Sequence, residues 1–324
     1  AELRAELGSV ADITKHPFAA LNTAFLHDGF VLRVPAGVVI EQPVQTLFLH
    51  TPVGQAVAVH PRVLVVAGEN SQVTFIERYG IDCIGALAGA PCFTNAVTEY
   101  VLAAGARVRA LRIQHEGTNT YHVGLTAARQ ARDSRFDSIS LSLGGSIDRN
   151  EIHVTLEEQG AECNLNGLYV LGQSEHVDNH TVIRHEVPHC KSTQLFKGVL
   201  GGKSNGAFTG RVVVAPDAQK TVAEQANHSL LLSDHAVAET RPQLEIYADD
   251  VQCSHGATIG RLDEEALYYL RSRGIGPRTA RNLLVHAFAS EIPAAAEEPQ
   301  LIDGLETLIA SRLEGRARVL EDDA

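Results

Sequence analysis

Short apolar runs separated by turn residues dominate the chain from about residue 28 to residue 260. Runs such as "FVLRV", "TLFLH", "RVLVV" and "QVTFI" are rich in β-branched residues, and Gly, Asn, Asp or Pro follows most of them. Val and Ile favour extended backbone because their branched side chains restrict χ1 and pack well on a pleated surface. The pattern predicts a core made of many short strands in a mainly β fold.

Two features favour a parallel β-helix for this core. Similar corners recur at Ala36-Gly37, Ala67-Gly68 and Ala104-Gly105, and few Asn-Gly or Asp-Gly hairpin signals occur, Asp28-Gly29 being one. Stacked rungs turn their corners at residues that accept left-handed backbone, and each rung buries its inward side chains on the next. The residue pattern alone leaves a β-sandwich and a jelly roll open as alternatives.

Helical patterns flank the strands. Residues 1–27 are typical of a partial N-terminal helical segment, and because the chain starts at Ala1 we expect more of a helical region to precede it. Residues 261–324 predict a C-terminal helical domain, which begins after the acidic Asp263, breaks at Gly274 and resumes at Pro277; a third helix is expected at about 300–313.

The end of such a core needs a cover. The last turn leaves unpaired backbone groups, which either the chain's own helices or a strand from another protein must satisfy.

Composition narrows the function classes. A net charge of −12 argues against nucleic acid as a partner, since phosphate binding needs a basic surface. No apolar run reaches the length needed to cross a membrane, and no signal peptide is visible. Five scattered cysteines without a paired framework indicate reduced thiols in a cytoplasmic protein. They are Cys83, Cys92, Cys163, Cys190 and Cys253.

The sharpest candidate chemistry lies in "EIYADDVQCSHGAT", residues 245–258. In an extended strand Cys253 and His255 point to the same face, where a thiolate and an imidazole can bind iron or another transition metal. Two ligands do not complete a site, so the others must come from elsewhere in the chain or from a partner. The alternative is a buried thiol beside a surface histidine.

Other clusters suit structural roles better. Pro188 interrupts "HEVPHC" (His185 to Cys190), which is interpreted as a loop, and "GGKSNGAFTG" lacks the spacing and the following helix of a phosphate-binding loop. No nucleophile stands near a base, so we expect a protein that is not an enzyme. The basic residues of the C-terminal region are interpreted as a solvated helix face: Arg271, Arg273, Arg278 and Arg281. The remaining histidines are expected at solvated strand or turn positions: His115, His122, His153, His176, His180, His228 and His235.

The segment "PQLEIYADDVQCSHGATIGRLDEEALYYLRSRGI" (242–275) resembles the SufB/SufD family of iron–sulfur cluster assembly proteins. Within it, "CSHGAT" followed by "YLRSRGI" is similar to the SufD branch. The resemblance extends upstream through "NLNGLYVLGQSEHVDNHTVIRHEVPHCKSTQLFKGVL" and "GAFTGRVVVAPDAQKT".

This resemblance implies a right-handed parallel β-helix over residues 28–260 and a scaffold subunit of the SUF assembly complex. It implies a SufB-like partner at the terminal strands and a SufC-like ATPase bound through about 262–292. His255, and less directly Cys253, would assist a nascent iron–sulfur cluster at the boundary with the SufB-like subunit, with no cofactor bound tightly by the isolated chain.

Two alternatives stay open at the level of sequence. A β-helix enzyme acting on polysaccharides would normally offer aromatic platforms and paired carboxylates, whereas this chain has no Trp and only 5% aromatic residues. A homodimeric binding module needs only the unpaired strand edge, so the isolated chain could pair with itself.

Overall fold

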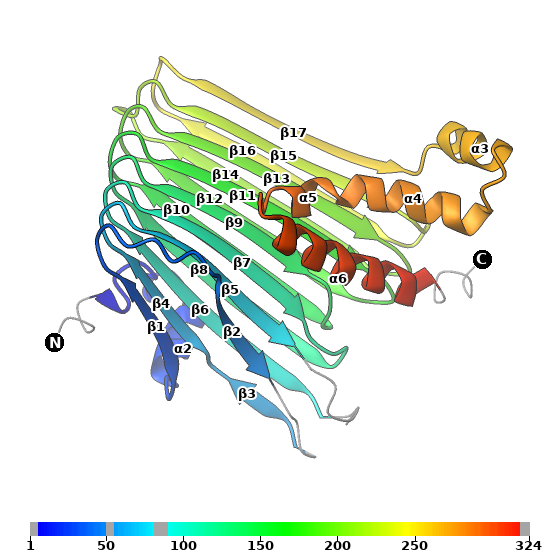
Figure 1. The fold of residues 1–324 in the computed structure, drawn as a ribbon, viewed down its shortest axis with the longest axis horizontal. Coiled ribbons are helices and arrows are strands. Elements are labelled where there is room, and N and C mark those ends of the chain that lie inside the picture. Colours follow the sequence, from blue (N-terminus) through cyan, green and yellow to red (C-terminus); the bar gives the residue numbers. More distant parts are fainter. Residues whose placement is uncertain (1–5, 50–54, 81–89, 318–324) are drawn as a thin grey trace.

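Strands alternate between two parallel sheets in the computed structural model, which describes residues 6–49, 55–80 and 90–317. Except for residues 57–59 and 62–67, which form two successive strands of one sheet, each pair of consecutive strands makes one turn of a solenoid, and the turns stack along its axis (Figure 1). The prediction of a parallel β-helix is therefore confirmed. Cys83 and the acidic C-terminal tail lie outside the described residues.

Sheet A contains nine of the described strands. They are β1 (Gly29–Val34), β3 (Val57–Val59), β4 (Arg62–Ala67), β6 (Cys92–Leu102), β8 (Thr120–Gln130), β10 (Ile147–Leu156), β12 (His176–His185), β14 (Asn205–Val214) and β16 (Val237–Ile246). Sheet B contains the other eight. They are β2 (Val44–Leu49), β5 (Gln72–Gly80), β7 (Arg107–His115), β9 (Arg135–Ser142), β11 (Glu162–Leu171), β13 (Lys191–Leu200), β15 (Val222–Leu231) and β17 (Gln252–Arg261).

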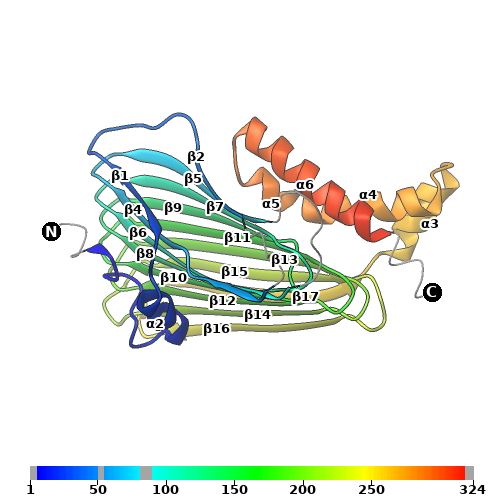
Figure 2. The ribbon, with the colours of Figure 1, turned by 90° about the horizontal axis from the view of Figure 1, so that it is seen from below.

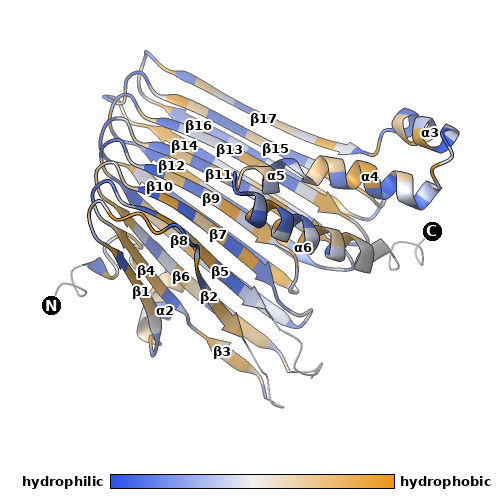
Figure 3. Cartoon of the chain, viewed as in Figure 1, coloured by the Kyte–Doolittle hydropathy of each residue, from blue (hydrophilic) through white to orange (hydrophobic). Residues whose placement is uncertain are grey.

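The register between neighbouring strands places side chains in columns along the solenoid. In sheet A, Ile147 lies beside His176, which lies beside Asn205. Along β10 and β14 buried and less buried positions alternate, because successive side chains point to opposite faces. Figure 3 shows the corresponding bands of hydrophobic and hydrophilic positions along the strands.

Left-handed residues form a column at one corner. Gly37 and Gly105 have φ values of 71° and 66°, as the recurrent Ala-Gly pattern predicted. At the rung between them the left-handed residue is Asn70, with φ 54°, and not the expected Gly68. Gly68 is required for close backbone packing instead, since a Cβ there would lie only 2.6 Å from the backbone nitrogen of Ala36.

The interior of the solenoid combines an apolar cluster with buried charges. Phe75, Tyr100 and Phe136 pack in series inside the first rungs. Elsewhere in the interior, the Arg112 guanidinium of β7 crosses between the sheets and donates two hydrogen bonds to Asp148 of β10, at 2.7 and 3.3 Å. Both side chains are buried, so this ion pair is shielded from water.

The N-terminal segment is fastened to the outer face of sheet A. The Glu99 carboxylate on β6 accepts hydrogen bonds from the backbone N–H groups of Gly8, Val10 and Ala11 at 2.9–3.0 Å. It also pairs with the buried Arg62 guanidinium of β4. The short helix α2 (Pro17–Ala24) follows and packs against β6 and β8.

The C-terminal helices lie on the opposite side of the molecule, outside sheet B (Figure 2). They are α3 (Glu264–Ser272), α4 (Pro277–Ala289), α5 (Glu291–Ala294) and α6 (Pro299–Ala317). Apolar residues of α4 to α6, including Val285, Ile292 and Ile309, pack on outward-facing residues of sheet B such as Leu141. No helix in the described part of the chain is long and apolar enough to span a membrane.

Helix boundaries follow the sequence signals closely. The Asp263 side chain caps α3 by accepting from the N–H of Glu265, Gly274 takes φ 84°, and Pro277 starts α4. Helix α3 is only partly covered: Leu267 and Leu270 are partly buried, whereas Tyr268 is 74% exposed. The reason is that α3 packs against α4 and projects beyond the end of β17 (Figure 1).

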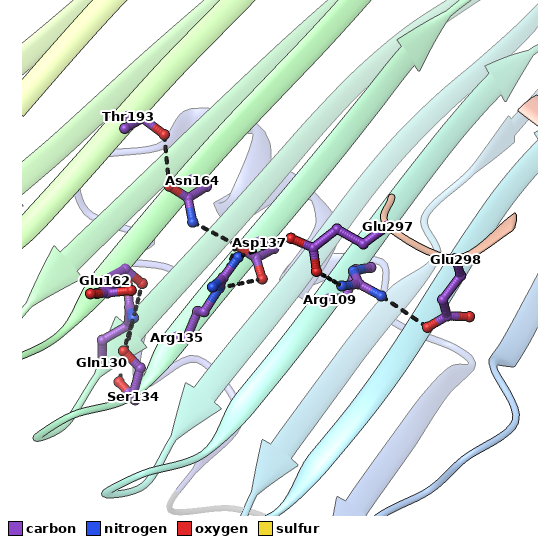
Figure 4. Close-up of polar contacts among 10 residues, drawn as sticks. All are labelled: Arg109, Gln130, Ser134, Arg135, Asp137, Glu162, Asn164, Thr193, Glu297 and Glu298. Atoms are coloured by element: carbon purple, nitrogen blue, oxygen red, sulfur yellow. Dashed lines mark hydrogen bonds and ion pairs between the residues drawn. The ribbon is translucent and has the colours of Figure 1, made fainter. Parts of the chain in front are cut away.

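Ion pairs hold the turn between α5 and α6 against sheet B. Arg109 of β7 donates to Glu297 at 2.7 Å and to Glu298 at 2.9 Å, and Figure 4 shows both glutamates pointing toward it. Arg135 on β9 lies 3.5 Å from Glu297. The helices therefore cover a face of the solenoid and leave its end free.

Candidate functional site

Cys253 and His255 lie on β17, the terminal strand of sheet B. Within the described residues β17 pairs only with β15, where Cys253 stands beside Ala223 and His255 beside Gln225. Ala223 and Gln225 are buried inside the solenoid. Because parallel partners in register point to the same face, Cys253 and His255 face the interior at its open end. We call this open end, formed by β16 and β17, the C-terminal mouth.

The two candidate ligands differ in exposure. Cys253 is partly buried and packs with Val214, Ala218 and Ala223, whereas His255 is exposed at the C-terminal mouth. Burial raises the pKa of the Cys253 thiol, although a backbone hydrogen bond at Ala223 acts in the opposite direction. The thiol is thus protonated at neutral pH, and a metal that binds it must displace a proton.

Unsatisfied polar groups lie just below the C-terminal mouth. Neither the oxygen nor the nitrogen of the Gln225 side-chain amide has a hydrogen-bond partner among the described residues, and the same holds for the Thr240 hydroxyl of β16. Gly210 makes room for the amide, since a Cβ there would lie 2.2 Å from its nitrogen. Buried polar groups are normally paired, so this end has hydrogen-bonding capacity to offer to a ligand or partner.

The two terminal strands present different edges. In β17 the ten residues Gln252–Arg261 include no Asp, Glu, Lys or Pro, and Arg261 comes last. In β16, by contrast, Glu239, Arg241, Pro242 and Glu245 interrupt the edge. Natural proteins protect free edges with charges and proline, so β17, which has no Asp, Glu, Lys, Arg or Pro before its last residue, is the edge that suits strand pairing.

The exposed helix α3 borders a pocket of about 770 Å³ between α3, α4 and sheet B. Its lining includes Leu232, Leu267, Tyr268, Arg271, Arg281 and Val285. Arg281 is held in place by donating to the carbonyl oxygen of Leu232 at 2.7 Å. The interpretation of the arginines as a solvated face is therefore incomplete, because Arg271, Arg278 and Arg281 line this pocket.

The structure gives the other sequence candidates structural roles. His185 of "HEVPHC" is buried and lies 2.9 Å from the Ser192 hydroxyl, while His189 takes a left-handed corner with φ 62°. The stretch beginning at Gly201 is a turn followed by β14. The prediction of solvated histidines is wrong for His122, which is buried with its Nδ1 2.6 Å from Glu116. The reason is that His122 is at a position of β8 whose side chain points into the solenoid.

Comparison with protein-family models identifies two regions of the chain. Residues 50–288 match the SufBD core domain of the SUF system for iron–sulfur cluster assembly. Residues 3–46 match the SufBD protein N-terminal region. The first match spans most of the solenoid together with α3 and nearly all of α4.

Curated relatives give the same assignment. An iron–sulfur cluster assembly SufBD family protein of Synechocystis is 37% identical over 278 residues, covering 85% of this chain and 61% of that protein. The iron–sulfur cluster assembly protein SufD of Escherichia coli is 34% identical over 80% of this chain and 60% of its own length. SufD of Bacillus subtilis is 31% identical over 91% of this chain and 67% of its own length. The chain spans about three fifths of the first two relatives.

Proposed function

The chain belongs to the SufBD family of SUF iron–sulfur cluster assembly proteins, and on that premise we propose that it is a non-catalytic scaffold subunit of a SUF assembly complex. The observation that carries this proposal is the C-terminal mouth, where an edge strand without charge before Arg261 lies together with two side chains of metal-ligating type, Cys253 and His255. Its scattered cysteines, unpaired in the described residues, support a reducing compartment, which we take to be the cytoplasm.

The partner at the mouth is a SufB-like subunit that adds a strand to β17. Ten residues of extended backbone with a free edge supply main-chain hydrogen bonds for such an addition. The outer face of β17 is open as well, because a Cβ at Gly256 or Gly260 would meet no atom within 4 Å. Without the SufB-like subunit, the same edge is available to a second copy of this chain.

The cargo at the mouth is a nascent iron–sulfur cluster, the substrate of the assembly process. His255 offers an exposed imidazole, and Cys253 offers a thiol that is close by on the same face. Iron suits these ligand types, sulfide bridges the iron atoms, and the partner subunit supplies the remaining protein ligands.

A SufC-like ATPase binds the helical region at about 262–292. Helix α3 has no buried residue, and both Tyr268 and Tyr269 are exposed. Tyr268 borders the pocket beside Arg271 and Arg281. Exposed aromatic and arginine side chains are the residue types enriched at protein interfaces.

We expect His255→Ala to lower cluster formation by about tenfold or more, because it removes an exposed ligand without disturbing packing. The measurement is iron and sulfide bound after anaerobic reconstitution of the full chain with its SufB-like and SufC-like partners. His176→Ala, a change on β12 of the other sheet, is the control and should leave the yield unchanged. An equal yield for the wild type and His255→Ala would remove the proposed role of the imidazole.

We expect Ser254→Lys to weaken binding of the SufB-like subunit by about tenfold or more, since a lysine on an edge strand blocks strand addition. Ser254 is exposed on β17, so the isolated chain should fold normally. Sedimentation velocity of the mixed subunits measures the association.

The matched control is Gln45→Lys, an exposed position on β2, which is the edge strand at the other end of sheet B. If Gln45→Lys were the variant that disrupted the complex, the partner would bind at the opposite end of the solenoid.

A further inference from the structure

Three potential metal ligands meet on the outer face of sheet A, far from the C-terminal mouth in the fold. His16 immediately precedes α2, while Glu151 and His153 stand two residues apart on β10. Outward-facing positions of β10 alternate with buried ones, so Glu151 and His153 both point toward the N-terminal segment. The His16 side chain makes no capping hydrogen bond to α2, which leaves its ring free to face β10.

The separations between the donor atoms suit a bound ion better than direct hydrogen bonds. His16 Nδ1 lies 3.6 Å and His153 Nε2 lies 3.9 Å from the same Glu151 oxygen, and all three donor atoms lie within 4.8 Å of one another. Hydrogen bonds to a carboxylate are much shorter, at about 2.7–2.9 Å. Ligands at zinc bond lengths of about 2.0–2.2 Å in a tetrahedron are separated by about 3.4 Å.

The side chains are also prepared for metal coordination. His153 Nε2 is buried without a hydrogen-bond partner among the described residues. Burial is the largest cause that lowers the pKa of His153, to about 4.

A supporting residue orients the carboxylate. Arg149 Nε donates to Glu151 Oε1 at 2.6 Å, and Arg149 also pairs with Asp178 on β12. This arrangement occupies one carboxylate oxygen and turns the other, Oε2, toward the two histidines. Hydrogen bonds from neighbouring residues to ligating side chains are a regular feature of metal sites.

We propose that His16, Glu151 and His153 form a mononuclear site for a divalent transition metal of the zinc type, with the fourth coordination position open. Two histidines and one carboxylate are an established zinc ligand set. The site joins the N-terminal segment to the solenoid, so binding of the ion reinforces that attachment. It does not depend on the proposed assembly function.

Titration of the metal-free full chain with Zn²⁺ and Co²⁺ tests the site. We expect one equivalent of Co²⁺ to give the visible absorption of a tetrahedral complex, and Zn²⁺ to displace it. Zn²⁺ should also slow proteolysis of the N-terminal segment. His16→Ala and His153→Ala should each weaken Zn²⁺ binding by more than about tenfold.

Two controls locate the bound ion. His228→Ala, on β15 of the other sheet, should leave the affinity unchanged. His255→Ala should also leave it unchanged, since that residue lies at the C-terminal mouth. His16→Ala alters a residue outside the strands, which guards against loss of folding. Binding that survives both His16→Ala and His153→Ala, or that is lost with His255→Ala, overturns the proposal.

Discussion

Asp148→Ala should lower the free energy of unfolding by about 3–5 kcal/mol, because it leaves the Arg112 guanidinium buried in the solenoid without its carboxylate. Asp148 is fully buried, and besides Arg112 it accepts a hydrogen bond from Ser142. Urea unfolding followed by circular dichroism measures the loss.

The double variant Arg112→Met with Asp148→Leu tests whether the stability lost in Asp148→Ala comes from the unpaired buried charge or from a packing defect. Replacing both partners with apolar residues removes the unpaired charge, so most of the lost stability should return. A loss below about 1 kcal/mol for Asp148→Ala alone would show that Arg112 finds another anion in the interior. Glu77, which lies beside Arg112 on the neighbouring strand, is the group in position to do so.

Glu99→Gln should cost a similar amount, about 3–5 kcal/mol, and should also release the N-terminal segment. The amide NH₂ of glutamine would be placed among donors that the carboxylate now satisfies: three backbone N–H groups and the Arg62 guanidinium. Urea unfolding measures the stability, and limited proteolysis measures how readily residues before β1 are cleaved.

Glu157→Gln is the matched control for Glu99. Glu157 is about half exposed, and its Arg129 partner lies 3.8 Å away, so the expected loss is below about 1 kcal/mol. An apolar replacement of Glu99 and Arg62 together should not restore stability, in contrast to the Arg112 and Asp148 pair, because the three backbone donors would still lack an acceptor. Full recovery of stability in the variant with both Glu99 and Arg62 replaced would mean that the three backbone hydrogen bonds to Glu99 do not contribute to stability.

Local signals in the sequence were sufficient to predict where the C-terminal helices α3 and α4 begin and end. The Asp263 cap, the left-handed Gly274 and Pro277 at the start of α4 act within a few residues, so pattern reading located α3 and α4. The strand runs predicted a mainly β core and favoured a β-helix, but they left a β-sandwich and a jelly roll open, and the resemblance to the SufB/SufD family decided between them. The covering of sheet B by α4 to α6 was not predictable, because it depends on outward apolar residues such as Leu141 that a strand pattern cannot assign to one face or the other.

The candidate sites likewise differ in whether the sequence could predict them. Cys253 and His255 share a face through neighbouring positions on one strand, which the sequence predicted directly. His16 and His153 are brought together by docking of the N-terminal segment, and nothing in the local sequence signals it. Arg112 and Asp148 come from strands of different sheets. The sequence pattern alone therefore could not predict that they form a buried ion pair, and each residue resembles a charged residue on an exposed strand face.

The direction of the strands determines how large an assembly the C-terminal mouth can build. A subunit of the same fold that joined mouth to mouth would pair its last strand antiparallel with β17. This two-fold contact would cover both mouths and leave neither open to a further subunit. Joining a mouth to the opposite end would instead keep all strands parallel and leave a free end on each subunit, so that growth could continue into a fibre. Mouth-to-mouth pairing therefore limits the assembly to two solenoids, each carrying its own α3 near the shared contact.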